Sequence, residues 1–301
     1  MGASRAGRYL AGVDGQAPSP GSGSSPARLE LGPLALRVRD LGAMRRFYTG
    51  VVGLEPVSAS SGVEVLGSDG RALVELREAP EAPPRPAGTS GLFHLAILEP
   101  DRAALAGTLR RLLDARAPLA GASDHIVSEA LYLDDPEGNG IEIYRDRPRE
   151  QWKWKDGEVA MATLPLDLSA LLAEADASGG PLVGRRLGHV HMNVGDLEAA
   201  HGFYAGVLGL DVTHGSYPGA LFVSEGGYHH DFGLNVWEGQ GAPPPPPGSL
   251  GLAGIAVGVP DAPSLDAIED RAGRAGVPAR REDGVLVVVD PFGVELRLAA
   301  G

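Results

Sequence analysis

The 301-residue sequence contains no cysteine. Disulfides, cysteine-ligated zinc or iron–sulfur sites and thiol nucleophiles are therefore excluded. Any metal ion must be held by histidine and carboxylate side chains, a ligand set suited to first-row ions such as Fe(II), Mn(II), Ni(II) or Zn(II).

Basic residues are also scarce, with 26 Lys and Arg against 39 Asp and Glu, for a net charge of −13. Nucleic acid is excluded as the main partner, because phosphate binding requires clustered positive charge. No apolar run approaches the length of a membrane span, so no membrane partner is expected. The segment 1–27 has no continuous apolar core and ends in the run SPGSGSSP, which predicts a disordered leader rather than a signal peptide. We therefore expect a cytoplasmic protein.

What the sequence does contain is an internal repeat. Residues 36–54 read LRVRDLGAMRRFYTGVVGL and residues 192–210 read MNVGDLEAAHGFYAGVLGL. The Asp-Leu, Phe-Tyr and Gly-Leu pairs match at one offset without a gap. A fixed offset over such a span indicates duplication of a structural unit.

The duplication extends to four units of the form strand, helix and three further strands. The second and fourth units share a first strand ending in Pro-Asp and a last strand opened by Asp-Pro and a glycine turn. The fold class predicted is α+β, with four βαβββ modules forming two cup-shaped sheets. The predicted segments are a leader 1–27, an N-terminal domain 28–148 with two modules, a connector 149–186, and a C-terminal domain 187–301 with two modules.

Equivalent positions of the modules differ in their polar residues. The first-strand positions are Pro33, His94, His189 and Gly254, and the last strands of the second and fourth modules carry Glu142 and Glu295. The two inner modules therefore hold two histidines and one glutamate. Two imidazoles and a carboxylate that leave adjacent faces open form the ligand set of a non-haem Fe(II) oxygenase.

Each of these residues also has a structural explanation. A lone strand histidine is commonly a hydrogen-bonded core residue, and Glu142 between two isoleucines would look the same on an exposed edge strand. Their equivalence within the repeat favours His94, Glu142 and His189 as metal ligands. Further candidates are His230, which we expect to open the last strand of the third module, and His125 with Tyr132 in the second.

These motifs resemble the vicinal oxygen chelate superfamily, which includes glyoxalase I and antibiotic-resistance proteins. The segment running from His125 through Tyr132 and Asp-Pro to Glu142 resembles the signature of extradiol ring-cleavage dioxygenases, with Ser123 as its one departure. GHVHMNV together with GGYHH is similar to the two-domain catechol 2,3-dioxygenases of the CatE type. The superfamily likeness covers nearly all of residues 28–300.

The resemblance implies roles for individual residues. His94, Glu142 and His189 would bind iron, His230 would be the acid–base histidine, and Tyr132 would hydrogen-bond a substrate oxygen. His125 belongs to the same signature and is a further catalytic candidate. In better-known extradiol enzymes the ligands come from the third and fourth modules, a scheme that Gly254 breaks here. The set is complete only if the second and third modules share one cup.

The function predicted is extradiol cleavage of catechol or a substituted catechol by O2 at Fe(II), with Mn(II) as the other candidate ion. Its partners would be a small aromatic diol and O2, and a homo-oligomer is compatible with the sequence. Two alternatives stay open. One is a binding protein that sequesters an aromatic ligand or antibiotic without turnover. The other is a glyoxalase-like isomerase, although such sites favour a second carboxylate ligand.

Overall fold

The computed structural model describes residues 29–175 and 183–301, so the predicted leader 1–27 lies outside the described residues. The N-terminal half contains two βαβββ modules, as predicted. The first comprises β1 (Glu30–Val38), α1 (Leu41–Phe47), β2 (Glu55–Ser60), β3 (Val63–Ser68) and β4 (Arg71–Glu78). The second comprises β5 (Gly91–Glu99), α2 (Arg102–Asp114), β6 (Gly121–Asp124), β7 (Ser128–Asp134) and β8 (Gly140–Asp146).

The C-terminal half repeats this order. The third module comprises β12 (Arg186–Asn193), α4 (Leu197–His201), β13 (Asp211–His214), β14 (Ala220–Ser224) and β15 (Phe232–Asn235). The fourth comprises β16 (Gly251–Val259), α5 (Ala262–Ala275), β17 (Ala279–Glu282), β18 (Val285–Val289) and β19 (Glu295–Ala300). Between the halves lie η3 (Arg149–Gln151), β9 (Trp154–Lys155), β10 (Glu158–Val159), β11 (Leu164–Pro165) and α3 (Leu168–Leu172).

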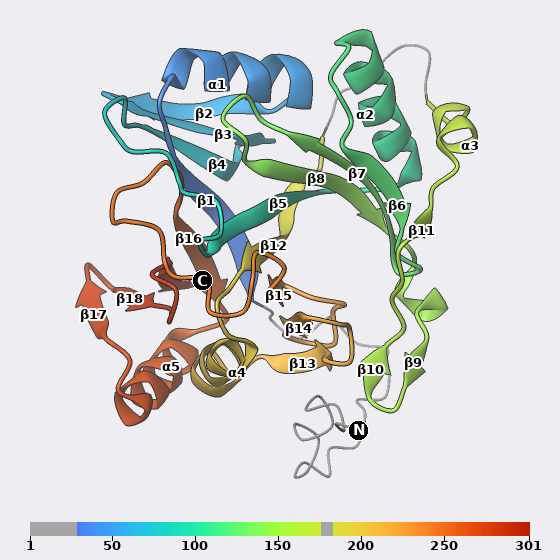
Figure 1. Cartoon of the computed structure of the whole chain (residues 1–301). Helices are drawn as coiled ribbons and strands as arrows, with labels where there is room; N and C mark the ends of the chain where they lie inside the picture. The colour runs from blue at the N-terminus through green and yellow to red at the C-terminus, as the bar shows by residue number, and fades with distance from the viewer. Residues whose placement is uncertain (1–28, 176–182) are drawn as a thin grey trace.

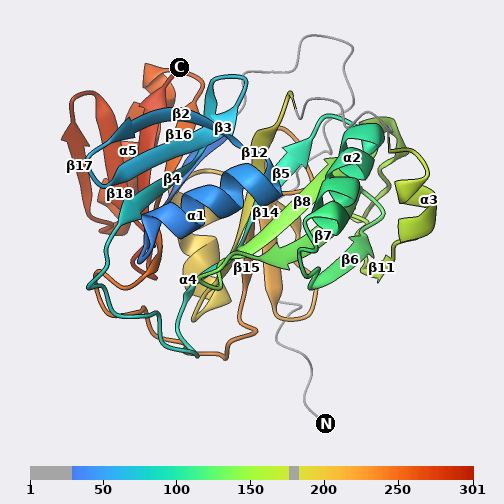
Figure 2. The same cartoon turned by 90° about the horizontal axis from the view of Figure 1, so that it is seen from above.

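The modules pair across the two halves of the chain rather than within them. β5 runs antiparallel to β12, and β1 runs antiparallel to β16. In every module the last strand lies parallel to the first, as β8 does beside β5 and β15 beside β12. One cup is thus built from the second and third modules and the other from the first and fourth, with helices on the outer faces (Figures 1 and 2).

This arrangement is the one that the histidine positions required. The inner cup joins the two modules that carry His94, Glu142 and His189. The predicted boundaries of the sequence domains, 28–148 and 187–301, stay a prediction, because each cup draws on both segments.

The repeated helix segment has the same local structure in both copies. Asp40 and Asp196 cap α1 and α4 by accepting the backbone N–H three residues later, at 2.8 Å in each copy. Each helix continues into a π-helical turn, η2 (Tyr48–Val52) and η4 (Gly202–Val207). Gly53 and Gly209 then adopt left-handed φ values of 85° and 84°, which explains the glycine at that position. In the described part of the chain, no helix combines the length and apolarity needed to cross a membrane.

A tyrosine of each such turn connects neighbouring modules. The Tyr48 hydroxyl donates to Asp135 at 3.1 Å, and the Tyr204 hydroxyl donates to Asp290 at 2.9 Å. Both tyrosines are fully buried, and both aspartates belong to the Asp-Pro turn of the following module. The repeat therefore preserves a buried polar contact as well as apolar packing.

Candidate active site

Three side chains from three strands converge in the inner cup. His94 Nε2 lies 3.0 Å from Glu142 Oε2, His189 Nε2 lies 3.3 Å from the same oxygen, and the two Nε2 atoms are 3.4 Å apart. The exposed fraction of each residue is 6% or less. The pairing of β5, β8 and β12 thus brings together residues that are 47 and 95 positions apart in the sequence.

The strand register explains why these residues meet. Ala96, which lies two residues after His94 on β5, pairs with Glu142 of β8 and with His189 of β12. Next to His189 the chain has Gly188, whose added Cβ would lie 2.0 Å from the Tyr144 hydroxyl. Glycine is needed there because a side chain would displace the Tyr144 ring, which packs against His189 with centroids 4.8 Å apart.

The protonation states of His189 and Glu142 suit metal binding. Burial lowers the pKa of His189 to about 4, although Glu142 opposes the shift, so the imidazole is neutral near pH 7. Burial alone would raise the pKa of Glu142, but His189 and His94 outweigh it and hold the pKa well below its usual range. The site therefore presents the neutral imidazole of His189 and the carboxylate of Glu142.

The spacing of the donor atoms fits one face of a first-row metal ion. Bonds of about 2.1 Å at roughly right angles place adjacent ligand atoms about 3 Å apart. The observed separations are 3.0–3.4 Å, and all three donor atoms lie within 4.8 Å of one another. Within the described residues no other group of histidine and acidic side chains converges in this way.

His230 lies beside the trio rather than within it. Its ring centroid is 4.2 Å from that of His189, and burial lowers its pKa well below the usual value for histidine. The expectation that His230 opens the last strand of the third module is wrong. β15 begins only at Phe232, so strand alternation does not apply to His229 and His230, whose rings are hydrogen-bonded through their Nδ1 atoms at 2.8 Å.

Tyr132 and His125 form a hydrogen-bonded pair on the other side of His94. Tyr132 projects from β7 opposite Glu142 of β8, and its ring lies 5.7 Å from that of His94. His125 Nδ1 contacts the Ala162 carbonyl at 2.9 Å and must donate to it, so in a neutral ring Nε2 accepts from the Tyr132 hydroxyl at 2.7 Å. Burial and then Glu142 raise the pKa of Tyr132 well above its usual value, so the phenol remains protonated.

The structure adds an aromatic group that the sequence did not reveal. Phe93, His191 and Trp237 form a triangle with ring centroids 5.2–5.3 Å apart, and Phe222 packs 4.9 Å from His230. Phe93 and Trp237 are 41% and 48% exposed, so this group lies at the entrance to the cup. In the sequence, Phe93 is notable only as an apolar residue next to a candidate ligand. Trp237 follows a strand and belongs to no recognisable motif.

The outer cup has no comparable set of ligands among its described residues. Pro33 and Gly254 occupy its first strands and offer no ligand side chain. Glu295 is engaged by Arg280 at 2.8 Å and by Arg297 at 3.3 Å. These arginines neutralise the carboxylate that corresponds to Glu142.

A separate cavity of about 1100 Å³ is lined by charged residues that include Arg102, Arg145, Asp146 and Arg186. None of the three candidate ligands lines it. The convergence of the donor atoms, rather than the volume of this cavity, defines the candidate site.

Comparison with known proteins agrees with this architecture. The Glyoxalase/Bleomycin resistance protein/Dioxygenase superfamily matches residues 30–143 and 186–298, and the chain belongs to this superfamily. The sequence is 41% identical over 268 residues to the catechol-2,3-dioxygenase of Bacillus subtilis (strain 168), covering 87% of this chain and 93% of that protein. The predicted superfamily and the resemblance to catechol 2,3-dioxygenases are confirmed.

Solved structures support the fold alone. A crystal structure of a Bacillus subtilis protein superposes with a TM-score of 0.65 at 14% identity, covering 91% of this chain and 86% of that chain. Glyoxalase I from Zea mays superposes with a TM-score of 0.58 at 18% identity, covering 90% and 92% of the two chains. The predicted α+β fold of repeated modules is confirmed.

Proposed function

We propose that this chain is an extradiol dioxygenase that cleaves the ring of a catechol with O2 at an Fe(II) site formed by His94, Glu142 and His189. The observation that carries the proposal is the convergence of the three donor atoms at 3.0–3.4 Å in a buried cup. The relationship to the Bacillus subtilis enzyme supports the enzyme class expected from sequence. Mn(II) would fit the same ligands.

The bound ion would acidify the catechol hydroxyls and hold both the diol and O2 at its open positions. The protein residues supply the remaining functions. His230, neutral and beside His189, is placed to accept a substrate proton. Tyr132 keeps its proton and is hydrogen-bonded to His125, so its hydroxyl oxygen would accept a hydrogen bond from a substrate hydroxyl.

The entrance of the cup favours an aromatic diol as the substrate. Phe93 and Trp237 offer ring faces and edges for offset or edge-to-face packing. His191 completes the group, and its Nε2 is buried without a hydrogen-bond partner. Such a wall positions an uncharged ring and excludes water from the reacting atoms.

The proposed dioxygenase and a sequestering protein, the first alternative, predict different results in one assay. Anaerobic protein loaded with Fe(II) is mixed with catechol and then with O2, while oxygen uptake and absorbance are followed. A dioxygenase consumes one O2 per catechol, both oxygen atoms enter the product, and a yellow hydroxymuconic semialdehyde appears. Saturable binding of catechol without oxygen uptake would instead identify a sequestering protein and contradict the proposal.

A glyoxalase-like isomerase is the second alternative. The inner cup provides a single carboxylate at the convergence point, Glu142, whereas isomerases of this type favour two. Conversion of a hemithioacetal by the Ni(II)- or Zn(II)-loaded chain, with no oxygen uptake in its Fe(II) form, would favour the isomerase. A cytoplasmic location stays a prediction from sequence, and a homo-oligomer is compatible with the sequence.

A further inference from the structure

A hydrogen-bonded chain leads from His230 to the end of β8. His230 Nδ1 lies 2.8 Å from His229 Nδ1, and His229 Nε2 lies 2.9 Å from Asp146 Oδ1. His229 is fully buried and His230 is 8% exposed, whereas the Asp146 side chain is 22% exposed. None of the motifs in the sequence includes Asp146.

The polarity of this chain follows from what each group can donate. An ionised carboxylate only accepts, so His229 Nε2 carries a proton toward Asp146. In a neutral His229 ring, Nδ1 is then a lone pair, and the proton between the two Nδ1 atoms belongs to His230. His230 Nε2 is left as a lone pair, which is the form a general base requires.

We infer that Asp146 is a positioning residue that acts through His229 to hold His230 in the tautomer with a free Nε2. The inference rests on the proposed function, in which His230 accepts a substrate proton. The opposite polarity would need a positively charged His229 and would put the proton on His230 Nε2. That charge would lie beside other imidazoles and next to the proposed dication, with His189 only 6.0 Å away between ring centroids.

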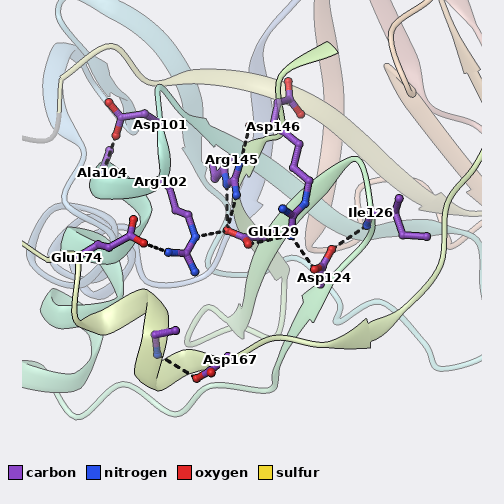
Figure 3. A network of polar contacts seen from close by, with 12 residues as sticks. Asp101, Arg102, Ala104, Asp124, Ile126, Glu129, Arg145, Asp146, Asp167 and Glu174 are labelled. Atoms are coloured by element: carbon purple, nitrogen blue, oxygen red, sulfur yellow. Dashed lines mark hydrogen bonds and ion pairs between the residues drawn. The ribbon is translucent and has the colours of Figure 1, made fainter. Parts of the chain in front are cut away.

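The surrounding contacts hold Asp146 in place. Arg145 and Arg147, on either side of it, both donate to the buried Glu129, at 2.8–3.0 Å. Figure 3 shows the Arg145 side chain directed to Glu129 and the Asp146 carboxylate pointing away from that network. The Tyr228 hydroxyl also contacts Asp146 Oδ1 at 3.2 Å. The carboxylate is therefore oriented before any substrate binds.

The tautomers are measured directly on full-length, zinc-loaded protein labelled with ¹⁵N-histidine, because zinc is diamagnetic. Two-bond ¹⁵N–¹H correlations should show His229 protonated at Nε2 and His230 at Nδ1. In Asp146→Leu, His230 should shift toward the Nε2-protonated form. Asp146→Asn, which keeps an oxygen acceptor, should retain the parent tautomer. Tyr228→Phe removes one of the hydrogen bonds that orient Asp146 but leaves His229 its acceptor, so His230 should shift less than in Asp146→Leu.

Kinetics of the Fe(II) forms give the second measurement. Asp146→Leu should lower kcat by about tenfold to a hundredfold, with KM for catechol and iron content little changed. Asp146→Asn and Tyr228→Phe should each lose less. His230 protonated at Nε2 in the parent protein, or an unchanged tautomer in folded Asp146→Leu, overturns the inference. If the tautomers are as inferred but catechol is not cleaved, the proposed function fails and the positioning role of Asp146 on His230 stands.

Discussion

At the residue scale, His94, Glu142 and His189 are proposed to bind one metal ion together. Their donor atoms share one small volume, so removing any one leaves two ligands that hold a labile first-row ion weakly. We expect His94→Ala, Glu142→Ala and His189→Ala each to lose most bound iron after desalting. Iron per chain, measured by ferrozine assay or inductively coupled plasma spectrometry, checks this.

His191→Ala is the matched control for these variants. It removes a buried imidazole from the same strand as His189. The ring of His191 lies 4.9 Å from that of His94. The iron content of His191→Ala should stay close to that of the parent protein. Full iron in folded His189→Ala would contradict the ligand assignment.

His230 is predicted to act on the substrate and not on the metal. It contacts the ring of His189, but its Nδ1 is committed to His229. His230→Ala should keep its iron and lose about 10²- to 10⁴-fold in kcat, the usual contribution of an acid–base group. Loss of iron in this variant would instead make His230 a ligand. Circular dichroism and iron content are measured on the same preparation.

The candidate ligands could be predicted from sequence because they occupy equivalent positions of a repeat. His94 and His189 stand at one place in two modules, and Glu142 follows a recognisable Asp-Pro turn. Phe93, Trp237 and Asp146 could not be predicted, because their positions depend on contacts between segments that are far apart in the sequence. No local pattern encodes those contacts.

At the scale of elements, capping and turn residues gave reliable positions. Asp196 and Gly209, which belong to the repeated Asp-Leu and Gly-Leu pairs, mark the two ends of the third module's helical segment. The start of β15 was misplaced, because the histidines before it lie in an irregular segment held by side-chain contacts. Thr213 contacts the His229 carbonyl at 2.6 Å, a long-range bond with no sequence signal.

The Asp-Pro turn of the outer cup should make stability depend on pH. Burial raises the pKa of Asp290 from 3.8 to about 6, although backbone amides and Tyr204 oppose the shift. The folded state therefore binds this proton more tightly than the unfolded state. Its contribution to stability is full below about pH 4 and is lost as the pH rises through about 6.

Asp290→Asn should remove this dependence. The unfolding free energy of the variant minus that of the parent should increase by about 3 kcal/mol between pH 4 and pH 7, from the size of the shift. Urea unfolding at several pH values measures this difference. Tyr204→Phe should move the window upward, because the Tyr204 hydroxyl lowers the pKa of Asp290. A difference that does not vary with pH would contradict the assignment.

At the scale of the whole molecule, the order of modules determines where chemistry occurs. β5 pairs with β12 and β1 with β16, so the two modules that are adjacent in the middle of the chain form one cup. In the connector between them, β11 pairs with β6 of this cup. The outer cup is then assembled from the two ends of the described chain.

The outer cup is predicted to be structural, and this gives a stoichiometric test. Pro33 and Gly254 offer no ligand side chain, and Glu295 is already paired with Arg280 and Arg297. Glu295→Gln should therefore leave iron near one per chain and kcat nearly unchanged, whereas Glu142→Gln, the matched change in the inner cup, should lose both. Iron titration and oxygen uptake on the two variants decide the matter. Two irons per parent chain, or a folded but inactive Glu295→Gln, would place chemistry in the outer cup. Either result would mean that the Glu295 carboxylate leaves Arg280 and Arg297 to serve as a ligand.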